Sequence, residues 1–250
     1  MSRALQNRYR IGHFFYWMLK SEMHNPKVAE RNGLLLDAYL RGCQTHRVEL
    51  LKQNEVIEQL VSIAKHIKTV PAAGGQRLQT LHTMLAKMKL PPTFQLPLDP
   101  RYEVKGLIIE KCRFMDSKKV PLWLVFENAE KIGNPITVMF KEGDDLRQDV
   151  LTIQMLRLMD KLWKQEGMDL GMQIYGCIST GDENGMIEIV KNAATTAAIN
   201  KEAGGAKKVL SENTLKKWLA KHNESEAAWE KARDNFIRSC AAYCVATYVL

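Results

Sequence analysis

One lysine lies where it could bind a phosphorylated ligand, and two aspartates lie where they could hold that lysine in place. Lys141 ends the run VMFK and directly precedes a segment of helical periodicity, which we expect to be a helix over Asp145–Gln165. Asp145 and Asp149 are four residues apart on that helix and therefore share a face. A cation before such a helix can hold nucleotide phosphates when an acid on the helix holds the cation in place. The same spacing also fits solvated surface charges, so both interpretations stay open at this point.

A short polar loop offers further groups for phosphate. Residues 115–119, MDSKK, lie between two segments that we expect to be strands. The backbone amides of this loop, the Ser117 hydroxyl and the Lys118 ammonium suit a phosphate. They suit a plain hairpin turn equally well, since turns favour these residue types.

A later strand could bind a flat heterocycle through its backbone. The run Met186–Val190 alternates apolar residues around Glu188, as a strand at the edge of a ligand pocket would. Side chains alone do not show such backbone bonds. The strand aromatics Trp123 and Tyr175 fit a pocket wall, and they fit a packed core as well.

The periodicity of residues 104–192 predicts an antiparallel sheet with one long helix. Short runs rich in valine, isoleucine and aromatic residues alternate with polar turns, as strands do. The long helix follows the third strand, and GDENG at residues 181–185 predicts a hairpin turn. The expected strands are Val104–Phe114, Val120–Glu127, Ile136–Lys141, Gln173–Ser179 and Met186–Lys191.

Residues 1–90 have helical periodicity, broken at short turns. Short helices joined in this way predict the end of a stacked α-helical solenoid.

Residues 91–103 hold four prolines and predict an extended linker, and residues 193–250 return to a helical pattern. The predicted fold class is α+β. Within the segment 46–68, the apolar residues at close to helical spacing are Val48, Leu51, Val56, Leu60, Ile63 and Ile67.

Composition excludes several classes of site. No apolar run reaches the ~18 residues that a membrane-spanning helix needs, and the N-terminus does not resemble a secretory signal. The five cysteines contain no CxxC pair and the six histidines no HExxH or HxxxH pattern, so we predict reduced thiols and no metal site.

The net charge of +8 lies wholly in residues 1–90, where 14 Lys and Arg face 6 Asp and Glu. These charges are spread along the segment, which fits solvated helix faces. They also fit attraction to an anionic membrane, whereas no nucleic-acid-binding motif is present, so we expect no nucleic-acid partner.

The segment FKEGDDLRQDVLTIQ, residues 140–154, resembles the FKxGDDLRQDxLxxQ signature of phosphoinositide 3- and 4-kinases. RIGHFFYWMLKSE and AYLRGC resemble the end of the helical domain of class I phosphoinositide 3-kinase catalytic subunits. The resemblance is collinear over almost the whole chain. The other segments that resemble successive parts of that family are EKCRFMDSKKVPLWL, DLGMQIYGCISTGD, GMIEIVKNAATTAAI and SCAAYCVATYVL.

The resemblance implies a domain order and an activity. Residues 1–90 correspond to the end of the helical domain, 104–192 to the ATP-binding N-lobe of a kinase, and 193–250 to the start of its C-lobe. The implied activity is transfer of a phosphoryl group from ATP, with Mg²⁺, to the 3-hydroxyl of membrane phosphoinositides.

The resemblance also implies roles for individual residues. It places Lys141 on the ATP phosphates, and Asp149 and Tyr175 at the polar inner end of the adenine pocket. It matches Glu188 and Val190 to hinge residues that bond adenine through their backbone. The matched pocket walls and phosphate-loop serine are Met115, Trp123, Met139, Ile187 and Ser117.

Three positions depart from the family pattern: this sequence has Ile174 where the family has a proline, Ala242 where it has a glycine and Gly171 where it has an arginine. Neither the GDRHxxN catalytic loop nor the DFG metal-binding loop occurs in the 250 residues. We therefore expect a truncated kinase, inactive by itself, whose catalytic residues and Mg²⁺ ligands lie beyond this chain. The alternative is a non-enzymatic helical scaffold with a vestigial kinase lobe.

The resemblance implies partners as well. They are a phosphoinositide lipid at a membrane surface and, in the full-length protein, a regulatory subunit and a small GTPase. The implied location is the cytoplasm, with recruitment to the plasma membrane.

Overall fold

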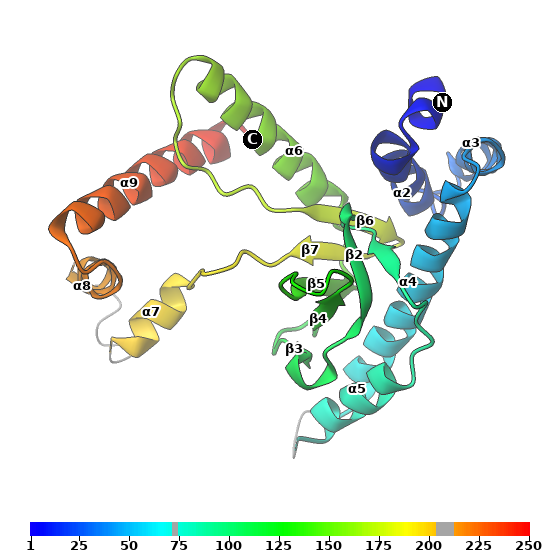
Figure 1. Cartoon of the computed structure of the whole chain (residues 1–250), viewed down its shortest axis with the longest axis horizontal. Coiled ribbons are helices and arrows are strands. Elements are labelled where there is room, and N and C mark those ends of the chain that lie inside the picture. Colours follow the sequence, from blue (N-terminus) through cyan, green and yellow to red (C-terminus); the bar gives the residue numbers. More distant parts are fainter. Residues whose placement is uncertain (72–74, 204–212) are drawn as a thin grey trace. The chain divides into compact units, whose positions relative to one another are not determined.

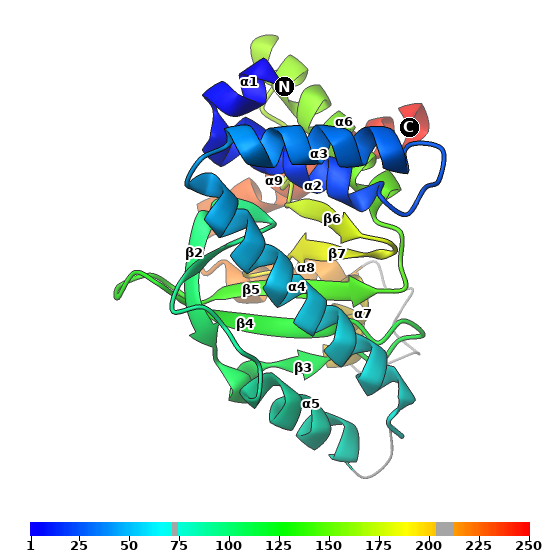
Figure 2. The ribbon, with the colours of Figure 1, turned by 90° about the vertical axis from the view of Figure 1, so that its right-hand side faces the viewer.

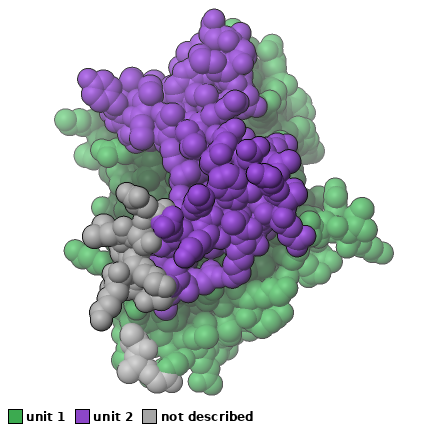
Figure 3. All heavy atoms as spheres, turned by 90° about the vertical axis from the view of Figure 1, so that its left-hand side faces the viewer, with its two compact units in different colours: residues 1–151, 175–189 green, residues 152–174, 190–250 purple. Residues whose placement is uncertain are grey.

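The computed structural model describes residues 1–71, 75–203 and 213–250. These residues form two compact units, coloured separately in Figure 3. Unit 1 holds residues 1–151 and 175–189, and unit 2 holds residues 152–174 and 190–250. Residues 204–212, part of the segment expected to begin the C-lobe, lie outside the described residues.

The N-terminal part of unit 1 is helical, as its periodicity predicts. The elements are α1 (Ser2–Gln6), a π-helical turn (Arg8–Gly12), α2 (His13–Ser21), α3 (Ala29–Gly42), α4 (His46–Thr69) and α5 (Gln76–Ala86). In α4 the later part of the predicted apolar stripe is buried, from Val56 to Ile67. Val48 and Leu51 are exposed, because the buried face at the start of α4 runs through Leu50 and Gln53 instead.

An antiparallel sheet follows these helices in unit 1 (Figure 1). Six strands pair in the order β1-β2-β4-β5-β7-β6, and β3 pairs with β4 off this path. The two residues Asp182 and Glu183 join β6 to β7, with Glu183 at a φ of 49°, within the predicted hairpin turn. The strands are β1 (Phe94–Leu96), β2 (Asp99–Leu107), β3 (Arg113–Phe114), β4 (Leu122–Asn128), β5 (Ile136–Glu142), β6 (Cys177–Gly181) and β7 (Asn184–Glu188).

The segment 91–103, expected to be an extended linker, contains β1 and the first half of β2. Phe94 and Leu96 are fully buried, and β1 pairs antiparallel with β2. The prolines permit this pairing because Pro97 lies in the turn between the strands. Pro100 precedes Val104, the first residue of β2 that pairs with β4. That a domain boundary falls in this segment stays a prediction.

The two faces of the sheet differ in burial. Along β5, Ile136, Val138 and Phe140 are buried, whereas the alternate residues, including Met139 and Lys141, are half-buried. Side chains alternate between the faces of a strand, so one face belongs to the core and the other is more open. Helices α4 and α5 pack against the sheet (Figure 2), and one core contains buried residues of both layers.

Unit 2 consists of helices and their connections. The helix α6 (Arg147–Gln165) begins in unit 1, and its residues from Thr152 onward belong to unit 2. Helices α7 (Thr196–Glu202) and α9 (Glu226–Val249) start at hydroxyl caps, since the side chains of Thr195 and Ser225 accept hydrogen bonds from backbone N–H groups. The remaining described helix of unit 2 is α8 (Asn213–His222).

The described residues confirm the predicted α+β class: helices, an antiparallel sheet with one long helix after β5, and further helices. Among the helices of the described ranges, none combines the length and the apolar character that crossing a membrane requires.

Candidate functional site

A row of apolar side chains crosses the more open face of the sheet. Trp123 of β4 lies opposite Met139 of β5, and Met139 lies opposite Ile187 of β7. Paired residues on neighbouring strands point to the same face, so the three side chains are neighbours. All three are half-buried. Three predicted wall residues, far apart in the sequence, thus form one continuous apolar surface, which we call the apolar row.

Both ends of the apolar row carry a further side chain. The guanidinium of Arg113, which pairs with Trp123 across β3 and β4, lies 4.5 Å from the centroid of the Trp123 ring. This cation–π contact holds the indole in place. Cys177 of β6 pairs with Ile187 at the opposite end.

Lys141 lies on the same face as the apolar row, two residues beyond Met139 along β5. Its ammonium forms an ion pair with the Asp144 carboxylate at 2.8 Å, and both side chains are mostly buried. The backbone turns back toward the lysine at Gly143, whose φ of 73° suits glycine.

The acidic partner of Lys141 corrects our expectation of an acid on the following helix. Asp145 precedes α6, accepts the backbone N–H of Arg147 at 3.1 Å and binds the Arg147 guanidinium. Asp149 lies in the first turn of α6 and is exposed. Asp144 was missed because only the turn at Gly143 brings it to the lysine. The signal for it was the glycine between the two residues.

Asp149 nevertheless lies near enough to Lys141 to share an electrostatic environment with it. The pKa of the Cys177 thiol is raised to about 12, chiefly by burial and also by the negative charge of Asp149, while the positive charge of Lys141 opposes the shift. Both charges therefore affect the pKa of Cys177, and the three side chains belong to one region of unit 1.

The loop before β4 is closed by its own backbone. The Met115 N–H donates to Pro121 O at 2.9 Å, and the Ser117 N–H donates to Met115 O at 3.0 Å. The Ser117 amide is thus bonded within the loop, as the hairpin-turn interpretation predicts, whereas its side chain is exposed. Lys119 of the same loop donates a hydrogen bond to Gly143 O, so the loop contacts the turn beside Lys141.

Glu188 ends β7 with its side chain and backbone both engaged. Its N–H donates to Gly176 O at 2.8 Å, and its carboxylate accepts the Gly176 N–H at 2.7 Å. These bonds fix the strand end next to Tyr175, which is 39 % exposed. Val190 is the first residue of the second segment of unit 2, whereas the other nine predicted site residues lie in unit 1.

This arrangement suits a molecule with a flat apolar part and an anionic part. The apolar row can pack against a heterocycle, because half-buried apolar surface gains free energy when it is covered. Lys141 lies on the same face, where its ammonium can bind phosphate. The residues present thus fit a nucleotide. Within residues 1–71, 75–203 and 213–250, no group of three or more His, Cys, Asp and Glu side chains could hold a metal ion.

Comparison with known proteins agrees with the motifs. Residues 135–250 match the family model described as phosphatidylinositol 3- and 4-kinase. Residues 1–52 match the accessory domain (PIK domain) of the phosphoinositide 3-kinase family.

The whole chain aligns with three proteins of Dictyostelium discoideum. It is 59 % identical to phosphatidylinositol 3-kinase 2, 52 % to phosphatidylinositol 3-kinase 1 and 42 % to phosphatidylinositol 3-kinase 3. The alignments cover 100 % of this chain and 13 %, 16 % and 15 % of those proteins, so the chain spans about one-seventh of their length. On these matches, the chain belongs to the phosphoinositide 3-kinase family.

Proposed function

We propose that this chain forms the ATP-binding part of a class I phosphatidylinositol 3-kinase, which phosphorylates the 3-hydroxyl of membrane phosphoinositides. The observation that carries the proposal is the apolar row, with Lys141 one step further along the same face. The named relatives support the reaction class. The kinase acts in the cytoplasm and is recruited to the plasma membrane, where its lipid substrate lies.

The residues of the chain have distinct parts in this proposal. The apolar row packs against the adenine, and the backbone of Glu188 bonds its edge. Lys141 neutralises phosphate charge, and Asp144, at 2.8 Å, fixes the ammonium in the required position. The exposed hydroxyl of Ser117 bonds a phosphate oxygen. When bound, ATP with Mg²⁺ supplies the phosphoryl group and the charge neutralisation that its transfer requires.

Binding of a fluorescent ATP analogue to the 250-residue chain tests the proposal. We expect saturable binding that unlabelled ATP competes away. Lys141→Met should weaken it, since the variant keeps the apolar stem but loses the charge. The matched control is Lys131→Met, because Lys131 is exposed in the segment between β4 and β5. No binding by a folded wild-type chain, or equal affinities for the two variants, contradicts the proposal and favours the scaffold alternative.

A further inference from the structure

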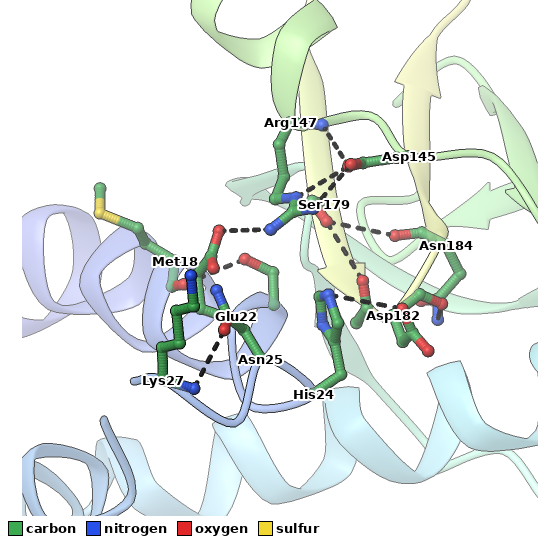
Figure 4. Close-up of polar contacts among 12 residues, drawn as sticks. Met18, Glu22, His24, Asn25, Lys27, Asp145, Arg147, Ser179, Asp182 and Asn184 are labelled. Carbon is green, nitrogen blue, oxygen red and sulfur yellow. Dashed lines mark hydrogen bonds and ion pairs between the residues drawn. The ribbon is translucent and has the colours of Figure 1, made fainter. Parts of the chain in front are cut away.

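Arg147 joins the start of α6 to the end of α2. Its guanidinium bonds the Glu22 carboxylate at 2.8 Å and the Asp145 carboxylate at 2.9 and 2.7 Å (Figure 4). Glu22 caps the C-terminus of α2, and 125 positions separate it from Arg147. Glu22 lies in the range that matches the accessory domain and Arg147 in the range that matches the kinase. We call these three residues the Arg147 bridge.

A second polar contact runs parallel to the bridge. His24, just after α2, lies with its Nε2 3.5 Å from the Asp182 carboxylate in the turn between β6 and β7 (Figure 4). The next residue of that turn, Glu183, accepts the backbone N–H of Asp144 at 2.8 Å. The loop after α2 is thus connected to Asp144 through two side chains and one backbone bond.

The two routes end at neighbouring residues, one of which holds Lys141. One reaches Asp145 through Arg147, and the other reaches Asp144 through the β6–β7 turn. Asp144 forms the ion pair with Lys141 at 2.8 Å. The position of the α2 end therefore bears on the placement of the Lys141 ammonium.

We propose that Glu22 and Arg147 are positioning residues of the kinase: the Arg147 bridge sets the loop 143–146, and through Asp144 the Lys141 ammonium, according to where α2 lies. The functional part of this proposal rests on the proposed ATP site. A partner or membrane that displaces α2 would alter phosphate binding through the same contacts.

The geometry and exposure of the bridge favour positioning over bulk stabilisation. The Glu22 and Arg147 side chains are 30 % and 37 % exposed, and ion pairs of that exposure add little to overall stability. The fork of the guanidinium, by contrast, bonds Asp145 through two nitrogens and fixes direction as well as distance. Loss of the bridge should therefore change local order more than the thermal midpoint.

The test compares Glu22→Gln and Arg147→Lys with the wild-type chain. A lysine ammonium is a point charge and does not reproduce the planar fork. Glu30→Gln is the control, because Glu30 is an exposed acid of the neighbouring α3. Hydrogen exchange of the Asp144 amide, measured without nucleotide, reports the loop itself. Affinity for the fluorescent ATP analogue reports the consequence for the site.

We expect the Asp144 amide to exchange faster in both variants and ATP-analogue affinity to fall about 3- to 30-fold, with the thermal midpoint close to wild type and Glu30→Gln unchanged. Unchanged exchange in Glu22→Gln overturns the positioning role. So does loss of the folded state in both variants, since the pair would then be a structural contact. If the wild-type chain binds no nucleotide, the proposed function fails, and the exchange experiment still decides the bridge.

Discussion

The Nε2 of His13 lies 2.7 Å from the carbonyl oxygen of Pro97, so the first residue of α2 is bonded to the turn between β1 and β2. His13 is fully buried, and the His46 ring lies 6.3 Å away between centroids. The pKa of His13 is lowered to about 4, chiefly by burial and also by the nearby His46, while the Pro97 carbonyl and Asp99 oppose the shift. The ring is therefore neutral at physiological pH.

Acid should destabilise unit 1 through His13. The unfolded chain binds a proton at this histidine below its ordinary pKa of 6.5, whereas the folded chain does so only near pH 4. The contribution of His13 to the free energy of unfolding is therefore complete above pH 6.5. About 3 kcal/mol of it is lost as the pH falls to about 4. Chemical denaturation across this range should show a shallower pH dependence in His13→Gln. His66→Gln, at an exposed position of α4, should keep the wild-type dependence.

In the full-length kinase, Lys141→Met should lower turnover by on the order of 10²–10³ while the fold is kept. In the proposed function the ammonium acts on charge that develops at the phosphates, and an apolar stem cannot replace a preorganised contact of that kind. Lys141→Arg should restore turnover only in part. Lipid phosphorylation assays at matched folded fraction provide the measurement, with Lys131→Met as the near-silent control. Wild-type turnover in Lys141→Met would remove this lysine from the mechanism.

Gly185→Ala should destabilise the sheet by about 1–3 kcal/mol. Gly185 pairs with Lys141 across β5 and β7, and an added Cβ there would meet the backbone oxygen of Ile178 and lie 2.8 Å from a Leu146 methyl group. The backbone of β6 cannot move away without breaking its pairing with β7. Gly106→Ala is the control, since a Cβ there meets no described atom within 4 Å. Equal unfolding free energies for the two variants would contradict this account.

Alkylation of cysteines should reveal the charges around Lys141. Burial and Asp149 raise the pKa of Cys177, so its thiol stays protonated and should react slowly with iodoacetamide, whereas exposed Cys240 and Cys244 should react fast. Asp149→Asn should lower the pKa of Cys177 and speed its alkylation. Lys141→Met should slow it. Mass spectrometry of each peptide measures the rates, and a rate at Cys177 that neither substitution changes would place both charges too far away.

Most of the sheet and α6 could be predicted because their signals are local. The expected strand Val104–Phe114 is instead divided into β2, a 3-10 turn at Ile109–Lys111 and β3. The alternation along Ile136–Lys141 is visible in the residues themselves, and so are the helical spacing after Asp145 and the turn residues at 181–185. The family motif added Trp123, Met139 and Ile187, which the strand register brings side by side. Their binding of a nucleotide stays a prediction.

Other features depend on tertiary contacts that no local pattern contains. The partner of Lys141 is decided by the backbone turn at Gly143. Residues 94–96 form a strand because β2 is available to pair with them, although the prolines around them indicate a linker. The contact between Glu22 and Arg147 joins helices that lie 125 positions apart.

The core of unit 1 is shared between the N-terminal helices and the sheet, with buried residues from Ala4 to Met186 in one cluster. Elements that share a core tend to open together, so their stabilities are coupled. A ligand that binds only the folded state adds RT ln(1 + [L]/Kd) to the free energy of unfolding. Nucleotide on the open face should therefore slow hydrogen exchange in α4, which packs on the sheet, even at residues the ligand never touches. Hydrogen exchange in α4 would then report whether the site is occupied, through thermodynamic linkage.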